Sequence, residues 1–300
     1  MSKQGSTPVA ALVLLIVTWG YSWIAMKIAL RYANPFDFAA LRVGIGALFL
    51  FTLVAARRGR LTLPSYRMAV VLGLLQVGLF VALSQLALTV AEPGRTSVLV
   101  FTMPFWMIVF AHFILHERIR GPQWIAVALA FAGLTLIVSP WNLASLAGSA
   151  LAVAAGAVWA ISAVVAKRWP APGSDTLAFT AWQLVFGFVA LGLVAWLHPH
   201  APVQWTGEFI AALLFSAVLA TGMGWWLWMY VLSRTTAGIA GLNSLGIPVV
   251  AVASSAIQLG ERPPANELAG MALIAVALAL LGWLGLRRPV APRLSPAARS

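Results

Sequence analysis

The sequence predicts an all-α integral membrane protein with ten transmembrane helices, arranged as two five-helix repeats of inverted topology. Three observations support this fold class. Hydrophobic residues make up 62% of the 300 residues and charged residues only 9%, whereas soluble domains are about half apolar and a quarter charged. Positive charge is concentrated in alternate connections between long apolar runs, and spaced motifs of the first half recur in the second half.

The composition also excludes several classes of protein. Ten spans of roughly 20 residues each use about two-thirds of the chain, which leaves no room for a folded soluble domain. The net charge of +12 could suggest nucleic-acid binding, but the basic residues lie in short connections, where they act as a topology signal. Because the chain contains no cysteine, disulfides, thiolate metal sites and thiol catalysis are excluded.

Five apolar runs, each bounded by charged residues or by Pro and Gly, predict the helices of the first half. The first run is about twice as long as the core of a signal peptide, so we expect it to be retained as a helix. The fifth run is the shortest of the five. The predicted helices are Pro8–Arg31, Phe36–Ala56, Arg67–Val90, Pro93–Leu115 and Pro122–Val138.

The second half shows the same alternation of apolar runs and short polar connections. Backbone groups in lipid must be hydrogen-bonded within the protein, and the alternating pattern of barrel strands is absent, so these runs are also expected to be helices. The predicted helices are Ser145–Ala166, Asp175–Leu197, Trp205–Leu232, Ala237–Gln258 and Pro264–Leu286.

Basic residues in the connections predict the orientation of these helices. One side would carry only three: Arg31, Arg95 and Arg262. The other side would carry fourteen: Lys3, Arg57, Arg58, Arg60, Arg67, Arg118, Arg120, Lys167, Arg168, Arg234, Arg287, Arg288, Arg293 and Arg299. Because cytoplasmic connections are enriched in Lys and Arg, both termini are expected to be cytoplasmic.

The two halves share motifs at matching places. In the first and sixth predicted helices a Trp is followed by Ser three residues later and by Lys eight residues later; these residues are Trp19, Ser22 and Lys27, and Trp159, Ser162 and Lys167. In the fourth and ninth a Pro lies thirteen residues before a Glu-Arg pair; these are Pro104 with Glu117, and Pro248 with Glu261. This pattern predicts a first repeat over residues 1–138, a second over 145–286 and a basic cytoplasmic tail over 287–300. Because five spans per repeat is an odd number, the second copy must be inverted in the membrane.

These residues also carry a family resemblance. The W-G-x-S-x-x-x-x-K segment from Trp19 to Lys27, the Ala40-Leu41-Arg42 stretch and the two Pro-to-Glu-Arg segments resemble the ten-helix EamA-type branch of the drug/metabolite transporter (DMT) superfamily. The resemblance extends from about residue 8 to residue 286. It implies transport of amino acids, other metabolites or toxic compounds, and the tryptophan-rich sequence most resembles the bacterial aromatic amino acid exporters.

No catalytic motif is present in the sequence. The nucleotide-binding, zinc-protease and serine-hydrolase patterns do not occur. His112 and His116 are four residues apart, but they lack a third ligand, so we expect no metal site. We therefore expect a protein that is not an enzyme, has no cofactor and binds neither nucleotide nor nucleic acid.

Polar and aromatic residues near the middle of the predicted helices are the candidates for binding substrate. Gln76, Phe80 and Ser84 lie four residues apart and share one helix face. The full set of candidates is Trp19, Ser22, Gln76, Phe80, Ser84, Phe101, Trp159, Ser162 and Asn243. For the Ser, Asn and Gln residues, hydrogen bonding to a neighbouring helix is the alternative. A second aromatic group, expected to form an interfacial belt, comprises Trp225, Trp226, Trp228 and Tyr230.

A second group of candidates has gating or structural roles. Lys27 and Lys167 lie near opposite ends of their helices and could either extend to the lipid headgroups or pair at gates. Arg42 lies deeper, and Asp37 or a helix-end carbonyl is its expected partner. Pro104 and Pro248 are expected to kink their helices.

The positions of the acidic residues separate two classes of substrate. All seven carboxylates lie at or near the ends of the predicted helices. A proton-coupled exporter of cations would be expected to hold a carboxylate in mid-membrane. The absence of such a carboxylate favours a neutral or zwitterionic metabolite. Together with the family resemblance, which implies transport and most resembles the aromatic amino acid exporters, it leads us to expect a transporter of the bacterial inner membrane. We expect this transporter to export small amphipathic metabolites, aromatic or large neutral amino acids above all, by alternating access. A multidrug or quaternary-cation exporter is the alternative. The expected partners of the protein are its substrate and membrane lipids, and a monomer would suffice for transport.

Overall fold

The computed structural model describes residues 6–57, 65–116, 121–138, 143–169, 175–197, 201–234 and 246–286. Within these ranges every regular element is a helix. Six helical stretches of the described chain are long and apolar enough to cross a membrane, and four shorter apolar helices accompany them. Asn243 and Glu117 lie outside the described residues.

The helices of the first half follow the predicted apolar runs closely. The third run is one continuous helical stretch made of three parts, and the fourth is divided in two. The elements are α1 (Ser6–Ala29), α2 (Pro35–Ala56), α3 (Tyr66–Leu72), η1 (Gly73–Leu79), α4 (Phe80–Val90), α5 (Pro93–Val100), α6 (Met103–Ile114) and α7 (Gly121–Val138).

The described elements of the second half follow a corresponding order. The eighth run is again a continuous stretch with a central part of different winding. The elements are α8 (Leu143–Arg168), α9 (Thr176–Leu197), α10 (Gly207–Leu214), η2 (Phe215–Met223), α11 (Gly224–Arg234), α13 (Gly246–Leu259) and α14 (Ala265–Leu286).

Local signals in the sequence explain where several helices begin. Asn34 caps α2, because its side-chain oxygen accepts a hydrogen bond from the backbone N–H of Phe36 at 3.0 Å, and Pro35 occupies the first helical position, where a missing N–H costs nothing. Thr206 caps α10 in the same way, with Phe209 N–H as donor at 3.1 Å. The chain between α5 and α6 leaves the helix at Phe101 and Thr102, two residues before Pro104.

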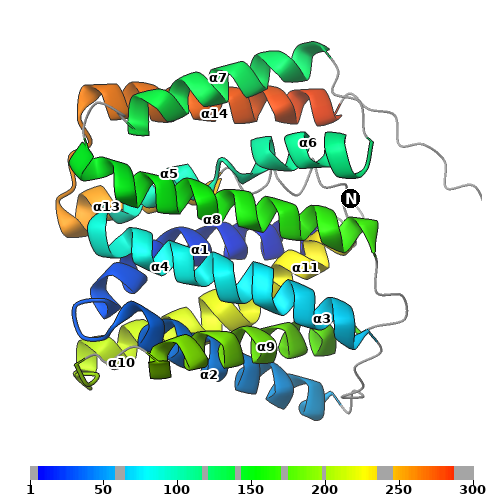
Figure 1. Ribbon diagram of the computed structural model, residues 1–300, viewed down its shortest axis with the longest axis vertical. Coiled ribbons are helices and arrows are strands. Elements are labelled where there is room, and N and C mark those ends of the chain that lie inside the picture. The colour runs from blue at the N-terminus through cyan, green and yellow to red at the C-terminus, as the bar shows by residue number, and fades with distance from the viewer. Residues whose placement is uncertain are drawn as a thin grey trace, which may run out of the picture.

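The helices run roughly parallel and form a layered bundle (Figure 1). At one edge α7 packs against α14, and at the opposite edge α2 packs against α9. Between these pairs α4 packs on α8, and α1 packs on α10 and η2. Likewise α1 packs on α13, and α8 packs on α5 and α6. Among the described helices, the main contacts that one half makes with the other therefore correspond to those of its counterparts.

Two features of the bundle were not predicted from the sequence. Both η1 and η2 are π-helical segments, and they occupy the centre of the third and the eighth stretch. Glycines of the neighbouring helices lie against them: a Cβ on Gly46 would lie 2.9 Å from the Ala217 carbonyl oxygen in η2, and one on Gly187 would lie 2.3 Å from Val77 Cγ1 in η1. Small residues thus allow α2 and α9 to approach the two π-helical segments closely.

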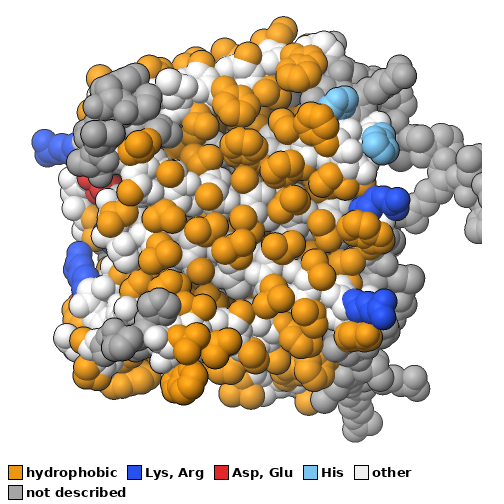
Figure 2. Space-filling view, in the orientation of Figure 1, with side chains coloured by type: hydrophobic (Ala, Val, Ile, Leu, Met, Phe, Trp, Pro, Cys, Tyr) orange, Lys and Arg blue, Asp and Glu red, His pale blue; other side chains and the backbone are white. Residues whose placement is uncertain are grey.

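The visible face of the bundle is a broad apolar surface (Figure 2). Charged side chains on this face lie at its two ends, where the helices begin and finish, and hydrophobic side chains cover the middle. Large apolar residues that are exposed in the described chain include Leu48, Val189 and Trp196. A surface of this kind is suited to lipid rather than to water.

Candidate functional site

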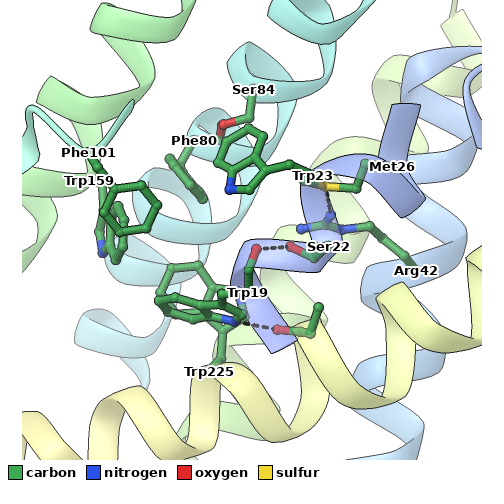
Figure 3. Close-up of a pocket in the computed structure, with 11 residues that line it drawn as sticks. Trp19, Ser22, Trp23, Met26, Arg42, Phe80, Ser84, Phe101, Trp159 and Trp225 are labelled. Atoms are coloured by element: carbon green, nitrogen blue, oxygen red, sulfur yellow. Dashed lines mark hydrogen bonds between the residues drawn. The ribbon is translucent and has the colours of Figure 1, made fainter. Parts of the chain in front are cut away.

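A cavity lies in the interior of the bundle, where helices of both halves meet (Figure 3). Its volume is about 40 Å³, which is room for a few water molecules at roughly 10–15 Å³ each. An organic solute can therefore enter only when the surrounding side chains move apart. The lining residues are Trp19, Ser22, Trp23, Met26, Arg42, Phe80, Ser84, Phe101, Trp159, Ala220 and Trp225.

Trp159 of α8 is the centre of an aromatic cluster beside this cavity. The Trp159 ring centroid lies 5.6 Å from that of Trp19, 5.3 Å from Phe80 and 5.5 Å from Phe101. It also lies 5.9 Å from Trp225 and 5.3 Å from Trp228. Most of these pairs meet edge to face, an arrangement that aromatic rings favour. The cluster provides flat apolar surfaces in several orientations around one point.

The two repeat-related tryptophans differ in their hydrogen bonds. Trp19 Nε1 donates to the carbonyl oxygen of Ala220 at 2.8 Å, and Ala220 belongs to the π-helical segment η2. π-Helical turns often occur at functional sites, because they change which carbonyls are bonded within the helix. Trp159 Nε1 is buried and has no hydrogen-bond partner among the described residues.

Arg42 of α2 brings a positive charge to the edge of the aromatic cluster. Its side chain is buried, with 7% of the residue exposed. The guanidinium contacts Met26 Sδ through Nη1, and Nε has no partner among the described residues. Met26 Sδ also accepts a hydrogen bond from Gln85 Nε2 at 3.1 Å. The structure thus pairs Arg42 with a thioether, whereas the sequence suggested Asp37 or a helix-end carbonyl.

Two serines of the cavity wall bond to their own helices. Ser22 donates to the Trp19 carbonyl at 2.7 Å, and Ser84 donates to the Phe80 carbonyl at 2.8 Å. Ser162, the counterpart of Ser22, donates to the Trp159 carbonyl at 2.7 Å in the same way. Because a hydroxyl that donates still has a lone pair free, Ser22 and Ser84 can accept a hydrogen bond from a ligand.

The structure brings six of the nine predicted substrate-binding residues to the cavity wall: Trp19, Ser22, Phe80, Ser84, Phe101 and Trp159. Gln76 and Ser162 are buried but do not line it. Asn243 lies outside the described residues. The prediction that Trp225 and Trp228 form an interfacial belt is wrong, because they are 4% and 1% exposed and pack on Trp159. Their position late in an apolar run suggested the membrane–water interface, but both side chains point into the bundle and pack on Trp159.

The two repeat-related lysines have different surroundings. Lys27 Nζ donates to the carbonyl oxygens of Leu88 at 2.6 Å and Ala91 at 2.9 Å, so it satisfies carbonyls at the C-terminal end of α4. Such a cation also interacts favourably with the helix dipole. Lys167, at the end of α8, is exposed.

A polar network joins four helices at the same end of the bundle as Lys27. Arg95 of α5 forms a salt bridge of 2.8 Å with Glu267 of α14. It also donates to the Ile137 carbonyl of α7 at 2.7 Å and to Ser149 Oγ of α8 at 2.9 Å. Nearby, Ser255 hydrogen-bonds Glu261, and burial raises the pKa of the Glu261 carboxyl.

The predicted structural prolines lie at two helix starts. Pro104 is the second residue of α6, which begins after the interruption at Phe101 and Thr102. Pro248 is buried near the start of α13. Phe101 reaches the cavity from this interruption. No group of three or more potential metal ligands occurs in the described part of the chain.

The chain matches a family model twice. The model, described as the EamA-like transporter family, matches residues 7–139 and again residues 146–283. The protein of Bacillus subtilis (strain 168) called uncharacterized transporter YoaV is 28% identical over 286 residues, which cover 93% of this chain and 98% of that protein. A probable amino-acid metabolite efflux pump of Salmonella typhimurium is 27% identical over 282 residues, which cover 88% of this chain and 91% of the pump.

A solved crystal structure has the same fold. It superimposes with a TM-score of 0.70 and covers 94% of this chain and 99% of the other. The sequence identity is 19%, so this likeness concerns the fold alone.

Proposed function

Because the chain belongs to the EamA-like transporter family, we propose that it exports aromatic and other large neutral amino acids across a bacterial inner membrane. One observation carries this proposal: a cavity between helices of both halves is lined by four tryptophans, two phenylalanines and a buried arginine. Ligand sites of this kind combine apolar surfaces with a few polar groups that fix orientation. A similarity to a probable amino-acid metabolite efflux pump supports the same class of substrate.

Transport would proceed by alternating access between two inverted five-helix repeats with both termini in the cytoplasm. Three findings support this part of the proposal. The family model matches each half separately. Corresponding helices make corresponding contacts across the halves, and π-helical segments occur at the same place in both. An inverted pair can open to either side around one central site.

Export of lipophilic cations is the competing function. The described residues that line the cavity include no carboxylate, and they include the cation Arg42. In a site of low dielectric constant, Arg42 would repel a second positive charge strongly. The electrostatics of the cavity therefore favour neutral, zwitterionic or anionic substrates over cations.

Transport of labelled amino acids into proteoliposomes tests the proposal. Without ATP, we expect phenylalanine and tryptophan to enter faster than they enter protein-free vesicles. We expect methionine and threonine to enter more slowly than these two aromatic amino acids. Trp159→Ala should abolish this movement, whereas Trp196→Ala, on the exposed surface, should leave it unchanged. If none of the four amino acids moved above the protein-free control, with or without a proton gradient, the proposed function would be wrong.

A further inference from the structure

Arg42 has an unusual environment for a buried arginine. A buried charge is costly unless an opposite charge or several hydrogen bonds compensate it. In this protein the guanidinium contacts the sulfur of Met26, and Nε remains without a partner among the described residues. A thioether is a weak hydrogen-bond acceptor. The guanidinium therefore has unused capacity to bind an anion.

The guanidinium also lies where a ligand can reach it. Arg42 and Met26 both line the cavity, and Trp23 and Ser22 lie beside them (Figure 3). On the other side of the cavity lies the aromatic cluster around Trp159. A charged group and an aromatic surface thus face the same small space.

We propose that Arg42 binds the carboxylate of the transported molecule, which replaces Met26 Sδ on the guanidinium. The planar guanidinium can hold a carboxylate with two parallel hydrogen bonds. Met26 is suited to giving way, because its unbranched side chain has three rotatable bonds. Its withdrawal would also enlarge a cavity of only about 40 Å³.

This inference rests on the proposed function, and it defines the class of transported substrate more closely. The aromatic part of the substrate would lie among Trp19, Phe80 and Trp159, and its carboxylate would lie on Arg42. No described residue of the cavity wall offers a carboxylate to an ammonium group. The substrates are therefore aromatic monocarboxylates, in which an amino group is tolerated but not required.

Binding of matched ligands to the purified wild-type protein tests this directly. Labelled phenylalanine and labelled 3-phenylpropionate, which lacks the amino group, are each titrated, and phenethylamine, which lacks the carboxylate, is added as a competitor. We expect both acids to bind and to compete with each other. Phenethylamine should compete at least roughly tenfold more weakly, since a hydrogen bond to a charged group contributes about 1.5–3 kcal/mol.

Two variants locate the effect. Arg42→Gln should weaken both acids roughly 10- to 100-fold and leave phenethylamine unchanged. Arg168→Gln, which removes an exposed arginine at the end of α8, should change none of the three. Arg42→Lys keeps the charge and should restore part of the binding of the acids.

The outcomes separate this inference from the proposed function. If phenylalanine binds but phenethylamine competes equally well, Arg42 does not select a carboxylate, while the amino-acid function stands. If only 3-phenylpropionate binds, in a manner that depends on Arg42, the carboxylate site on Arg42 stands, whereas the tolerance of an amino group and the amino-acid function fail. If neither acid binds, both are wrong.

Discussion

Trp19 and Trp159 have the same spacing to a following serine and lysine, yet only one of their indole N–H groups is hydrogen-bonded in the described structure. Trp19 Nε1 donates to Ala220, and Trp159 Nε1 has no partner in the described structure. Both rings are buried, at 8% and 1% exposure, and they contact each other. The pair therefore allows the contribution of one hydrogen bond to be separated from that of ring packing.

We predict that Trp19→Phe lowers thermal stability in detergent more than Trp159→Phe does. Both changes remove ring area from the cluster, but only the first leaves the buried Ala220 carbonyl without its donor. An unsatisfied buried acceptor costs about 1–3 kcal/mol. Equal losses of stability in the two variants would show that this hydrogen bond contributes nothing.

The composition of the site could be predicted from the sequence better than its contacts. Trp19, Ser22, Phe80, Ser84, Phe101 and Trp159 were identified because they lie near mid-helix, several at repeat-related positions, where transporter sites form, and they do line the cavity. The contact of Arg42 with Met26 was not predictable, since it depends on how α1 and α2 face each other. The burial of Trp225 was not predictable either, because an apolar run alone does not show which face of the helix packs against other helices.

At the scale of the helix, the apolar runs and their Pro, Gly and charged boundaries were sufficient to locate the helices. For example, Pro93 was predicted to begin a helix and is the first residue of α5. The π-helical winding of η1 and η2 could not be predicted, because it depends on packing between helices rather than on local propensity. The glycines that lie against these segments, Gly46 and Gly187, were visible in the sequence only as glycines within apolar runs.

We predict that Gly187→Ala impairs the protein and that Gly192→Ala, on the same helix α9, does not. A Cβ at Gly187 would lie 2.3 Å from Val77 Cγ1, whereas a Cβ at Gly192 would meet nothing within 4 Å. Forcing such a contact costs about 1–3 kcal/mol. Melting temperature and transport rate should both fall for the first variant alone. An undisturbed Gly187→Ala protein would mean that α9 and η1 separate at no cost.

At the scale of the whole molecule, one end of the bundle is tied together by Arg95. Its bonds to Glu267, Ile137 and Ser149 join α5 to α14, α7 and α8. Alternating access requires such connections to break when this end opens. The network is therefore expected to stabilise the state in which this end is closed.

We predict that Glu267→Gln makes this end open more often. A cysteine in place of Ser97, which is fully buried in α5, reports the opening, because the natural chain has no cysteine. Modification of this cysteine by a water-soluble maleimide should be faster with Glu267→Gln than without it. Unchanged rates in the two proteins would show that the salt bridge does not hold this end closed.

Alternating access requires the two ends of the bundle to open in turn around the tryptophan cavity. Spin labels on exposed residues of both halves measure this by electron–electron double resonance: one pair at Glu92 and Arg262, the other at Arg57 and Arg168. On addition of phenylalanine the two distance distributions should shift in opposite directions, and Trp159→Ala should suppress the shift. If both distances rose together, or neither changed while transport proceeded, alternating access around this cavity would be contradicted.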